Sequence, residues 1–152
     1  EFYYNLTHCT DYAALVIDTC DVGIDVEGIH KDGRKLAERF FAEEEKKALL
    51  EDFSDEAFTR LWTRKESYLK ATGVGMRMPL DAFCVLEEKV LRKETMPLEM
   101  VSEKDNYYIK SFCLKENAEL QNIWLSVCRK NRKITNIDIE FITRSDLKTV
   151  FK

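Results

Sequence analysis

The sequence predicts an α+β fold in which an antiparallel sheet packs against one long helix plus shorter helices. A stretch with helical spacing of apolar residues opens after Ser54, a good N-cap residue, and ends at Gly73. Short runs rich in β-formers lie on both sides of it. Two of these runs, 108–112 and 123–128, can pair in antiparallel fashion through the loop 116–119. This arrangement indicates an α+β class.

Length and composition indicate a single domain spanning residues 1–152. The 152 residues are 45% hydrophobic and 34% charged, which is enough to bury a core and remain soluble, and 5 Gly and 2 Pro leave no linker composition. The net charge of −4 argues against a nucleic-acid partner. The sequence has no long apolar run and no signal-peptide layout, so we expect no membrane association and a cytoplasmic protein. Five cysteines without a C-x-x-C pair argue against disulfides and cysteine-bound zinc.

Two strands are predicted at the start of the chain. Tyr12–Asp18 is a short apolar run and predicts a buried strand. Asp21 and Gly23 mark a turn, and a second strand covers residues 23–26. Asp25 and Glu27 stand two positions apart, so their side chains leave the same face of this strand.

Two helical segments follow. Residues 34–50 repeat apolar side chains at a spacing near 3.6, with a break and a new helix start around Ala42. The second helix runs from Ser54 to about Thr72, and its apolar stripe consists of Phe58, Leu61, Trp62 and Leu69. Gly73, Gly75 and Pro79 predict an irregular connection after it. Further strands are expected at 83–86, 107–112, 123–128 and 137–142.

Acidic residues on the second strand suggest a metal site. Adjacent carboxylates such as those of Asp25 and Glu27 repel each other unless a cation lies between them. Magnesium suits such a pair, because it binds a few carboxylates together with phosphate oxygens. The alternative is a surface strand that carries acidic side chains without a metal.

The long helix adds a carboxylate and two lysines. Trp62, Glu66 and Lys70 share one helical face, and Lys65 sits one step round. These side chains suit a metal–pyrophosphate centre, in which Glu66 completes the carboxylate set and the lysines neutralise phosphate oxygens. The alternative is an ordinary Glu66–Lys70 ion pair beside an apolar Trp.

A third element, residues 5–8 (Asn-Leu-Thr-His), comes just ahead of the first predicted strand. A single histidine at such a place is usually a turn or core residue. Beside a phosphate site, however, His8 could donate a ring N–H to a phosphate oxygen.

These elements, in this order, closely resemble the 4′-phosphopantetheinyl transferases of the surfactin-synthetase type. The resemblance rests on Asn-Leu-Thr-His, then Gly-Ile-Asp-Val-Glu at 23–27, Arg-Phe-Phe followed by Glu45, and Leu-Trp-Thr-Arg-Lys-Glu-Ser-Tyr-Leu-Lys-Ala-Thr-Gly at 61–73. It runs from Phe2 to about Phe83, with a looser β-rich continuation. The histidine element leads, whereas in the small trimeric holo-acyl-carrier-protein synthases it comes last. The resemblance implies a fold like that of these transferases.

The resemblance also implies a reaction and its residues. A serine hydroxyl of an apo acyl or peptidyl carrier protein would attack the β-phosphorus of coenzyme A, take up phosphopantetheine and release adenosine 3′,5′-bisphosphate. Carried over by position, the Mg²⁺ ligands would be Asp25, Glu27 and Glu66, and the catalytic residues Glu66 and Lys70. The coenzyme contacts would be His8, Thr7, Lys65 and Lys70, with Thr7 standing where the family commonly has Ser.

Surfactin-type transferases have two similar halves with the coenzyme between them, and this chain resembles the second half. Nearly the whole first half is absent, so we expect either a fragment or a site completed by another copy or another polypeptide. The resemblance implies a carrier-docking surface near residues 39–45 and 73–77. The rival interpretation is a non-catalytic domain of the same fold that binds coenzyme A or a carrier protein. Which carrier protein is modified stays open.

Overall fold

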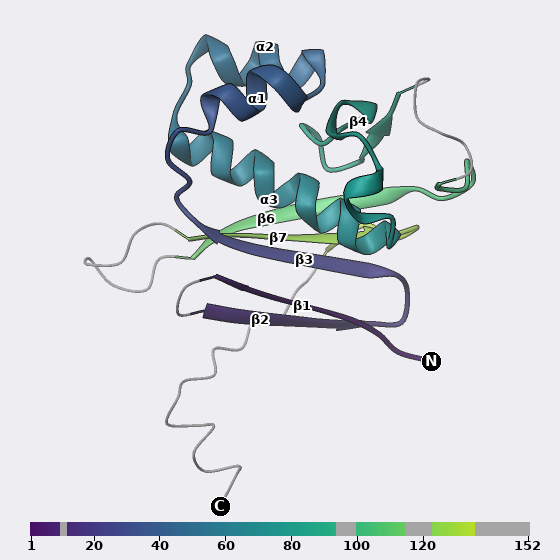
Figure 1. The fold of residues 1–152 in the computed structure, drawn as a ribbon. Helices are drawn as coiled ribbons and strands as arrows, with labels where there is room; N and C mark the ends of the chain where they lie inside the picture. Colours follow the sequence, from purple (N-terminus) through teal and green to yellow (C-terminus); the bar gives the residue numbers. More distant parts are fainter. Residues whose placement is uncertain (10–11, 94–99, 115–122, 136–152) are drawn as a thin grey trace, which may run out of the picture.

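The computed structural model describes residues 1–9, 12–93, 100–114 and 123–135. Its longest element is the helix α3 (Asp55–Thr72), which lies between two shorter helices and an antiparallel sheet (Figure 1). The short helices are α1 (Arg34–Phe40) and α2 (Glu43–Glu51). The expected α+β class is therefore confirmed. Among the described residues, no helix is both long and apolar enough to cross a membrane.

The sheet consists of β3 (Val22–Gly28), β7 (Ile123–Lys130) and β6 (Tyr107–Leu114), in that order and antiparallel. The predicted pairing of the last two strands is confirmed, with Phe112 opposite Leu125. Gly23, Asp25 and Ser126 lie toward α3, because successive side chains of a strand point to opposite faces. The loop 116–119 and the strand expected at 137–142 lie outside the described residues.

A hairpin of β1 (Tyr3–Cys9) and β2 (Tyr12–Asp18) lies beside β3 (Figure 1). It forms a separate two-stranded sheet, and side chains connect it to β3: the Asn5 Oδ1 accepts the Ile24 N–H at 3.0 Å. The apolar side chains between hairpin and sheet form their own cluster, which includes Val22, Ile24, Val26, Leu125 and Val127. The strand β1 was not expected from the sequence.

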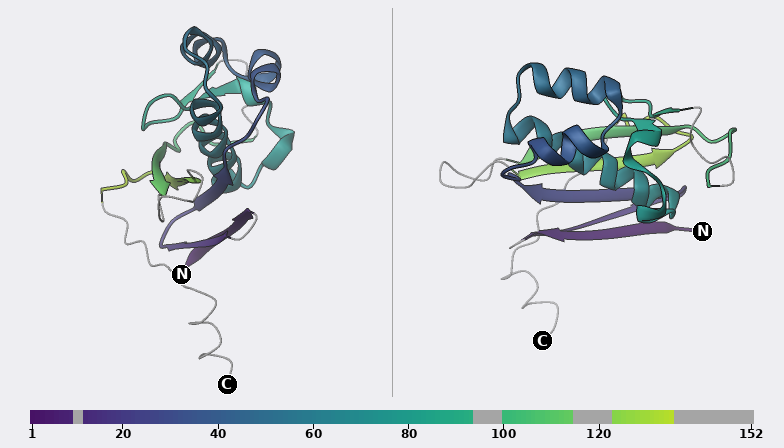
Figure 2. Two further views of the ribbon diagram at one scale, coloured as in Figure 1. Left: turned by 90° about the vertical axis from the view of Figure 1, so that its left-hand side faces the viewer. Right: turned by 45° about the horizontal axis from the view of Figure 1, so that its top comes forward.

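The prediction that Tyr12–Asp18 is a buried strand was wrong in its burial. The strand bounds are right, but every second residue of β2 is exposed, with Leu15 at 56% and Ile17 at 62%. The hairpin forms the outermost strands, on the far side of β3 from α1 and α2 (Figure 2), so only its inner face is covered. The outer side thus presents a row of large apolar residues, Phe2, Tyr4, Leu6, Leu15 and Ile17.

The helix ends follow the predicted local chemistry. The break near Ala42 separates α1 from α2, and the Glu45 Oε2 accepts the Ala42 N–H at 3.0 Å. The Ser54 Oγ accepts the Ala57 N–H at the start of α3, and Gly73 ends that helix with a φ of 69°. After it come η1 (Gly75–Arg77), η2 (Leu80–Ala82) and a short pair of β4 (Phe83–Cys84) with β5 (Leu91–Arg92). The predicted strand at 83–86 is thus shorter, and β5 was missed.

The main core lies around α3. Aromatic residues dominate it: Phe41 and Phe58 stack at 5.7 Å between ring centroids, and Tyr68 packs against Phe83 at 4.6 Å. All four of these side chains are fully buried. This core fixes α3 over the sheet, and α3 in turn places its other face against β3.

Gly23 is the point of closest approach between β3 and α3. A Cβ there would lie 2.1 Å from the Ser67 carbonyl oxygen and 2.4 Å from the Ala71 nitrogen, both backbone atoms that cannot rotate away. We predict that Gly23→Ala lowers the free energy of unfolding by about 1–3 kcal/mol or more, measured by urea denaturation. Gly28→Ala in the same strand, where a Cβ meets nothing within 4 Å, is the control and should change stability by less than about 0.5 kcal/mol. Equal effects would contradict this account.

Candidate functional site

A cavity of about 380 Å³ lies where β1, β3 and α3 meet. Its lining comes from all three elements that the sequence singled out: Leu6, Thr7, His8, Asp25, Glu27, Trp62, Glu66 and Lys70. The alternation of β3 puts Asp25 and Glu27 on the side of α3, and the four-residue spacing of α3 puts Trp62, Glu66 and Lys70 on the side of β3. The three carboxylates and Lys70, which the sequence predicted to lie close together, all line this cavity.

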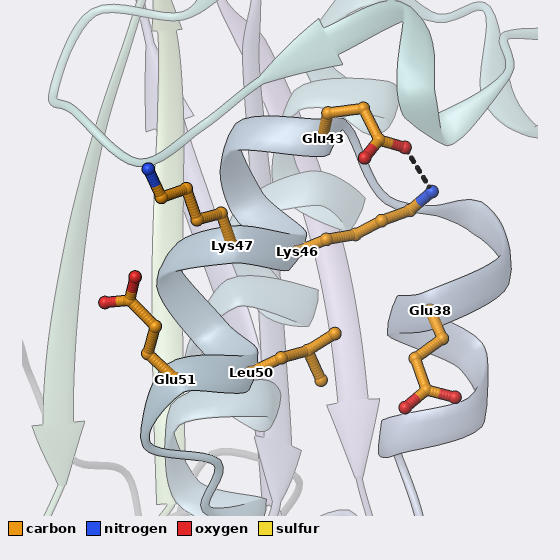
Figure 3. Close-up of a pocket in the computed structure, with 6 residues that line it drawn as sticks. All are labelled: Glu38, Glu43, Lys46, Lys47, Leu50 and Glu51. Atoms are coloured by element: carbon orange, nitrogen blue, oxygen red, sulfur yellow. Dashed lines mark hydrogen bonds and ion pairs between the residues drawn. The ribbon is translucent and has the colours of Figure 1, made fainter.

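A larger hollow of about 600 Å³ lies between α1 and α2 (Figure 3). Its lining is Glu38, Glu43, Lys46, Lys47, Leu50 and Glu51. The Lys46 ammonium bonds the exposed Glu43 carboxylate at 2.7 Å, and the other charged groups extend toward solvent (Figure 3). Such paired surface charges indicate a solvated groove, so we place the functional site in the smaller cavity.

Lys70 is the central cation of the site. Its Nζ lies 2.7 Å from the Asp25 Oδ1, 3.1 Å from the Thr7 Oγ1 and 3.2 Å from the Ile24 carbonyl oxygen. The Thr7 hydroxyl also donates to the Asp25 Oδ1 at 3.2 Å. Lys70 thus pairs with a carboxylate on β3, and not with Glu66 on its own helix as the surface-pair alternative required.

The carboxylates have more negative charge than Lys70 neutralises. Burial, followed by the nearby Asp25 charge, raises the pKa of both Glu27 and Glu66. Asp25 itself is only 4% exposed, and its Oδ2 is buried without a hydrogen-bond partner among the described residues. An unpartnered carboxylate oxygen near two other acidic groups is the environment that a hard divalent cation satisfies.

The donor set therefore fits a magnesium-type ion, although its ligands are not gathered in this conformation. In the part of the chain that the structure describes, no three His, Cys, Asp or Glu side chains form a ready metal-ligand group. Among the described residues the Asp25 Oδ2 has no hydrogen-bond partner, and Glu27 and Glu66 are half-buried on the lining of the same cavity. Binding of a cation therefore requires these carboxylates to move closer together than they are in this structure.

The prediction that Lys65 lies near the phosphate site was wrong. Lys65 is fully buried on another side of α3, where its Nζ bonds the Glu45 Oε2 at 2.7 Å. It also donates to the carbonyl oxygens of Leu80 and Phe83. Lys70 follows Lys65 by five positions, a rotation of about 140° around a helix, so the two ammonium groups lie on different sides of α3. Lys65 and Glu45 instead connect α2, α3 and the connection that follows α3.

The other expected residues lie at the site. His8 is exposed on β1 at the rim of the cavity, and Thr7 is buried beneath it. Sequence reasoning missed His30, whose Nε2 lies 3.8 Å from the Glu27 Oε2 and whose ring lies 6.2 Å from that of Trp62. No motif marks His30. Asn5 belongs to the Asn-Leu-Thr-His motif, and its spacing of two from Thr7 is typical of a shared strand face.

With this geometry established, comparison with known proteins identifies the family. A family model described as the 4′-phosphopantetheinyl transferase superfamily matches residues 21–128, more than half of the chain. The chain belongs to the 4′-phosphopantetheinyl transferase superfamily.

Several members of this superfamily are about a third identical to this chain over the matched residues. The 4′-phosphopantetheinyl transferase Sfp of Bacillus subtilis is 30% identical over 74% of this chain and 50% of its own length. The transferase gsp of Aneurinibacillus migulanus is 35% identical over 56% of this chain and 37% of its own length. The human L-aminoadipate-semialdehyde dehydrogenase-phosphopantetheinyl transferase is 34% identical over 53% of this chain and 30% of its own length. The chain thus spans about half the length, or less, of the curated relatives it matches.

The raised pKa of Glu66 leads to a pH-dependent prediction. A carboxyl group whose pKa is higher in the folded than in the unfolded state costs stability above that pKa range, and the cost disappears as pH falls below the ordinary Glu value. We therefore expect Glu66→Gln to raise the melting temperature of the metal-free chain at pH 7, with a smaller gain at pH 4. Thermal unfolding in EDTA at both pH values measures this.

Glu51→Gln, an exposed position on α2, is the matched control and should give no such pH-dependent gain. A destabilised Glu66→Gln chain at pH 7 would show that the carboxylate is needed without a metal, contrary to the electrostatic argument.

Proposed function

We propose that this chain forms the metal- and coenzyme-binding part of a 4′-phosphopantetheinyl transferase. Its reaction would move 4′-phosphopantetheine from coenzyme A to a serine of an apo acyl or peptidyl carrier protein, with Mg²⁺, in the cytoplasm. The observation that supports this proposal is the convergence of Asp25, Glu27, Glu66 and Lys70 in one cavity, from separate motifs of one transferase family.

The side chains would divide the chemistry as follows. Asp25, Glu27 and Glu66 would hold Mg²⁺, which when bound would neutralise charge on the pyrophosphate and orient it. Glu66, whose pKa is raised, is suited to accept the proton of the carrier serine as its oxygen attacks the β-phosphorus. The P–O bond to the nucleotide part breaks, and adenosine 3′,5′-bisphosphate leaves. Lys70 would steady the phosphate charge from α3, and His8 would contact a phosphate from the rim.

A second candidate function is a non-catalytic domain that binds coenzyme A or a carrier protein. The observation that favours it is the matched length, since the chain corresponds to half or less of its transferase relatives. Both candidates use the same cavity, so they differ in turnover and not in binding.

The apolar outer side of the hairpin supports a companion half. Tyr4, Leu6, Leu15 and Ile17 are exposed there, and Leu6 also lines the cavity, so this surface continues into the site. A contiguous apolar surface of this kind usually marks a protein interface. We propose that it packs against a polypeptide corresponding to the part of the relatives that this chain does not match, and that this packing completes the coenzyme site.

Coenzyme A binding tests the site in the chain as it is. In isothermal titration we expect coenzyme A to bind in Mg²⁺ and much more weakly in EDTA. Asp25→Asn should lower the affinity in Mg²⁺ by about tenfold to a hundredfold, as loss of a metal ligand or its supporting group does. Asp52→Asn, at the exposed end of α2, is the control and should bind as the unchanged chain does. Binding that is equal with and without Mg²⁺ would refute the proposed metal site.

Carrier modification tests turnover and the companion half. The chain is incubated with coenzyme A, Mg²⁺ and an apo carrier protein, and the carrier is weighed by intact-mass spectrometry over a range of chain concentrations. We expect Mg²⁺-dependent coenzyme binding with little transfer, because a completed site needs the second half. Transfer that rises with the square of chain concentration would instead identify a second copy as the partner. Transfer linear in concentration would show that the chain acts alone and would refute the companion half.

A further inference from the structure

The hydrogen bonds around Lys70 leave it no free donor. An ammonium group has three N–H bonds, and the Lys70 Nζ has three acceptors: the Asp25 Oδ1, the Thr7 Oγ1 and the Ile24 carbonyl oxygen. They belong to β1 and β3, so this side chain links α3 to both strands. Toward a phosphate, Lys70 therefore acts through its charge unless one of these bonds is given up.

The Thr7 hydroxyl is committed in the same way. Thr7 is 6% exposed, its hydroxyl hydrogen is donated to the Asp25 Oδ1, and its oxygen accepts from Lys70. A hydroxyl has one hydrogen to donate, so none is left for a phosphate oxygen. If Thr7 donated to the coenzyme, as the resemblance implied, its hydrogen bond to the buried Asp25 carboxylate would be lost.

These bonds fall on one oxygen of Asp25. Its Oδ1 accepts from both Lys70 and Thr7, while its Oδ2 is buried and has no partner in the part of the chain that the structure describes. Two donors on one oxygen fix the rotation of the carboxylate, so the free oxygen is presented in one direction. Groups that orient a metal ligand in this way contribute strongly to metal affinity, although they do not touch the ion.

We propose that Thr7 is a positioning residue, which together with Lys70 fixes the Asp25 Oδ1 so that the Oδ2 is presented to the metal ion. Asn5 supports this role, because its bond to the Ile24 N–H sets β1 beside β3 and brings Thr7, two residues on, against Asp25. The inference rests on the proposed function, since it assigns Thr7 to the metal side of that site and not to the coenzyme.

The test measures metal and coenzyme separately. Mn²⁺ binding to the chain is measured by electron paramagnetic resonance without coenzyme. The affinity should fall about tenfold in Thr7→Val, because this change removes the hydroxyl and keeps the shape of the side chain. Thr7→Ser should restore the affinity. Coenzyme A binding in EDTA should be unchanged in Thr7→Val. Thr63→Val is the matched control, because it removes an equally buried hydroxyl of α3 that bonds Ser126, away from the site, and it should bind Mn²⁺ normally.

The outcomes separate this inference from the proposed function. Normal Mn²⁺ affinity in Thr7→Val, or a loss confined to coenzyme binding in EDTA, would overturn the positioning role alone. An unchanged chain that binds Mn²⁺ no better than Asp25→Asn would overturn the proposed metal site, and the positioning role with it. If Thr7→Val does not fold, as judged by circular dichroism, Thr7→Ala removes the same hydroxyl with less steric demand and is measured in its place.

Discussion

The contact between β3 and α3 at Gly23 determines where every charged group of the site lies. Because position 23 has no side chain, the backbone of α3 at Ser67 and Ala71 approaches the strand directly. At that separation Lys70 reaches Asp25 at 2.7 Å, and Glu66 faces the same cavity. A larger residue would move the helix away and lengthen these contacts together. The glycine and the two acidic residues of one short motif therefore act as a unit.

The helix α3 carries one fully buried and one half-buried ion pair, and the two serve different purposes. Lys65 and Glu45 are both fully buried, and they also hydrogen-bond backbone groups of Ala42, Val85 and Leu80. Burial lowers the pKa of Lys65, and the Glu45 charge opposes that effect, so the pair is a structural connection. The Lys70–Asp25 pair borders a cavity and leaves an oxygen of Asp25 unsatisfied. An unsatisfied acceptor in a pair that borders a cavity indicates a binding site, whereas a pair with all its hydrogen bonds made is structural.

Much of this arrangement could be predicted from local sequence, and the exceptions have physical causes. The bounds of α3 follow from Ser54 and Gly73, and the shared face of Glu66 and Lys70 follows from helical spacing. The position of Lys65 was predicted wrongly because neighbouring helix residues differ by about 100° in direction. Its ion pair with Glu45 depends on how α2 packs against α3, which the local sequence does not show. The burial of Tyr12–Asp18 was misjudged because an apolar run does not tell which faces are covered. His30 follows Glu27 by only three residues, but it stands beyond the end of β3, where no strand or helix spacing predicts that the two side chains meet.

The exposed hairpin and the unsatisfied carboxylates are connected by the same strand. On β1, Asn5 and Thr7 point inward and bond β3, while Tyr4 and Leu6 point outward and stay exposed. A partner that covers the outer face would pack against β1, and the inner face of this strand orients Asp25 through Thr7. Burying apolar surface contributes about 25 cal/mol per Å², and a two-stranded hairpin has little stability of its own, so a partner would restrict its motion. Docking of a companion half would therefore affect metal binding through Thr7, without any contact between the partner and the ion.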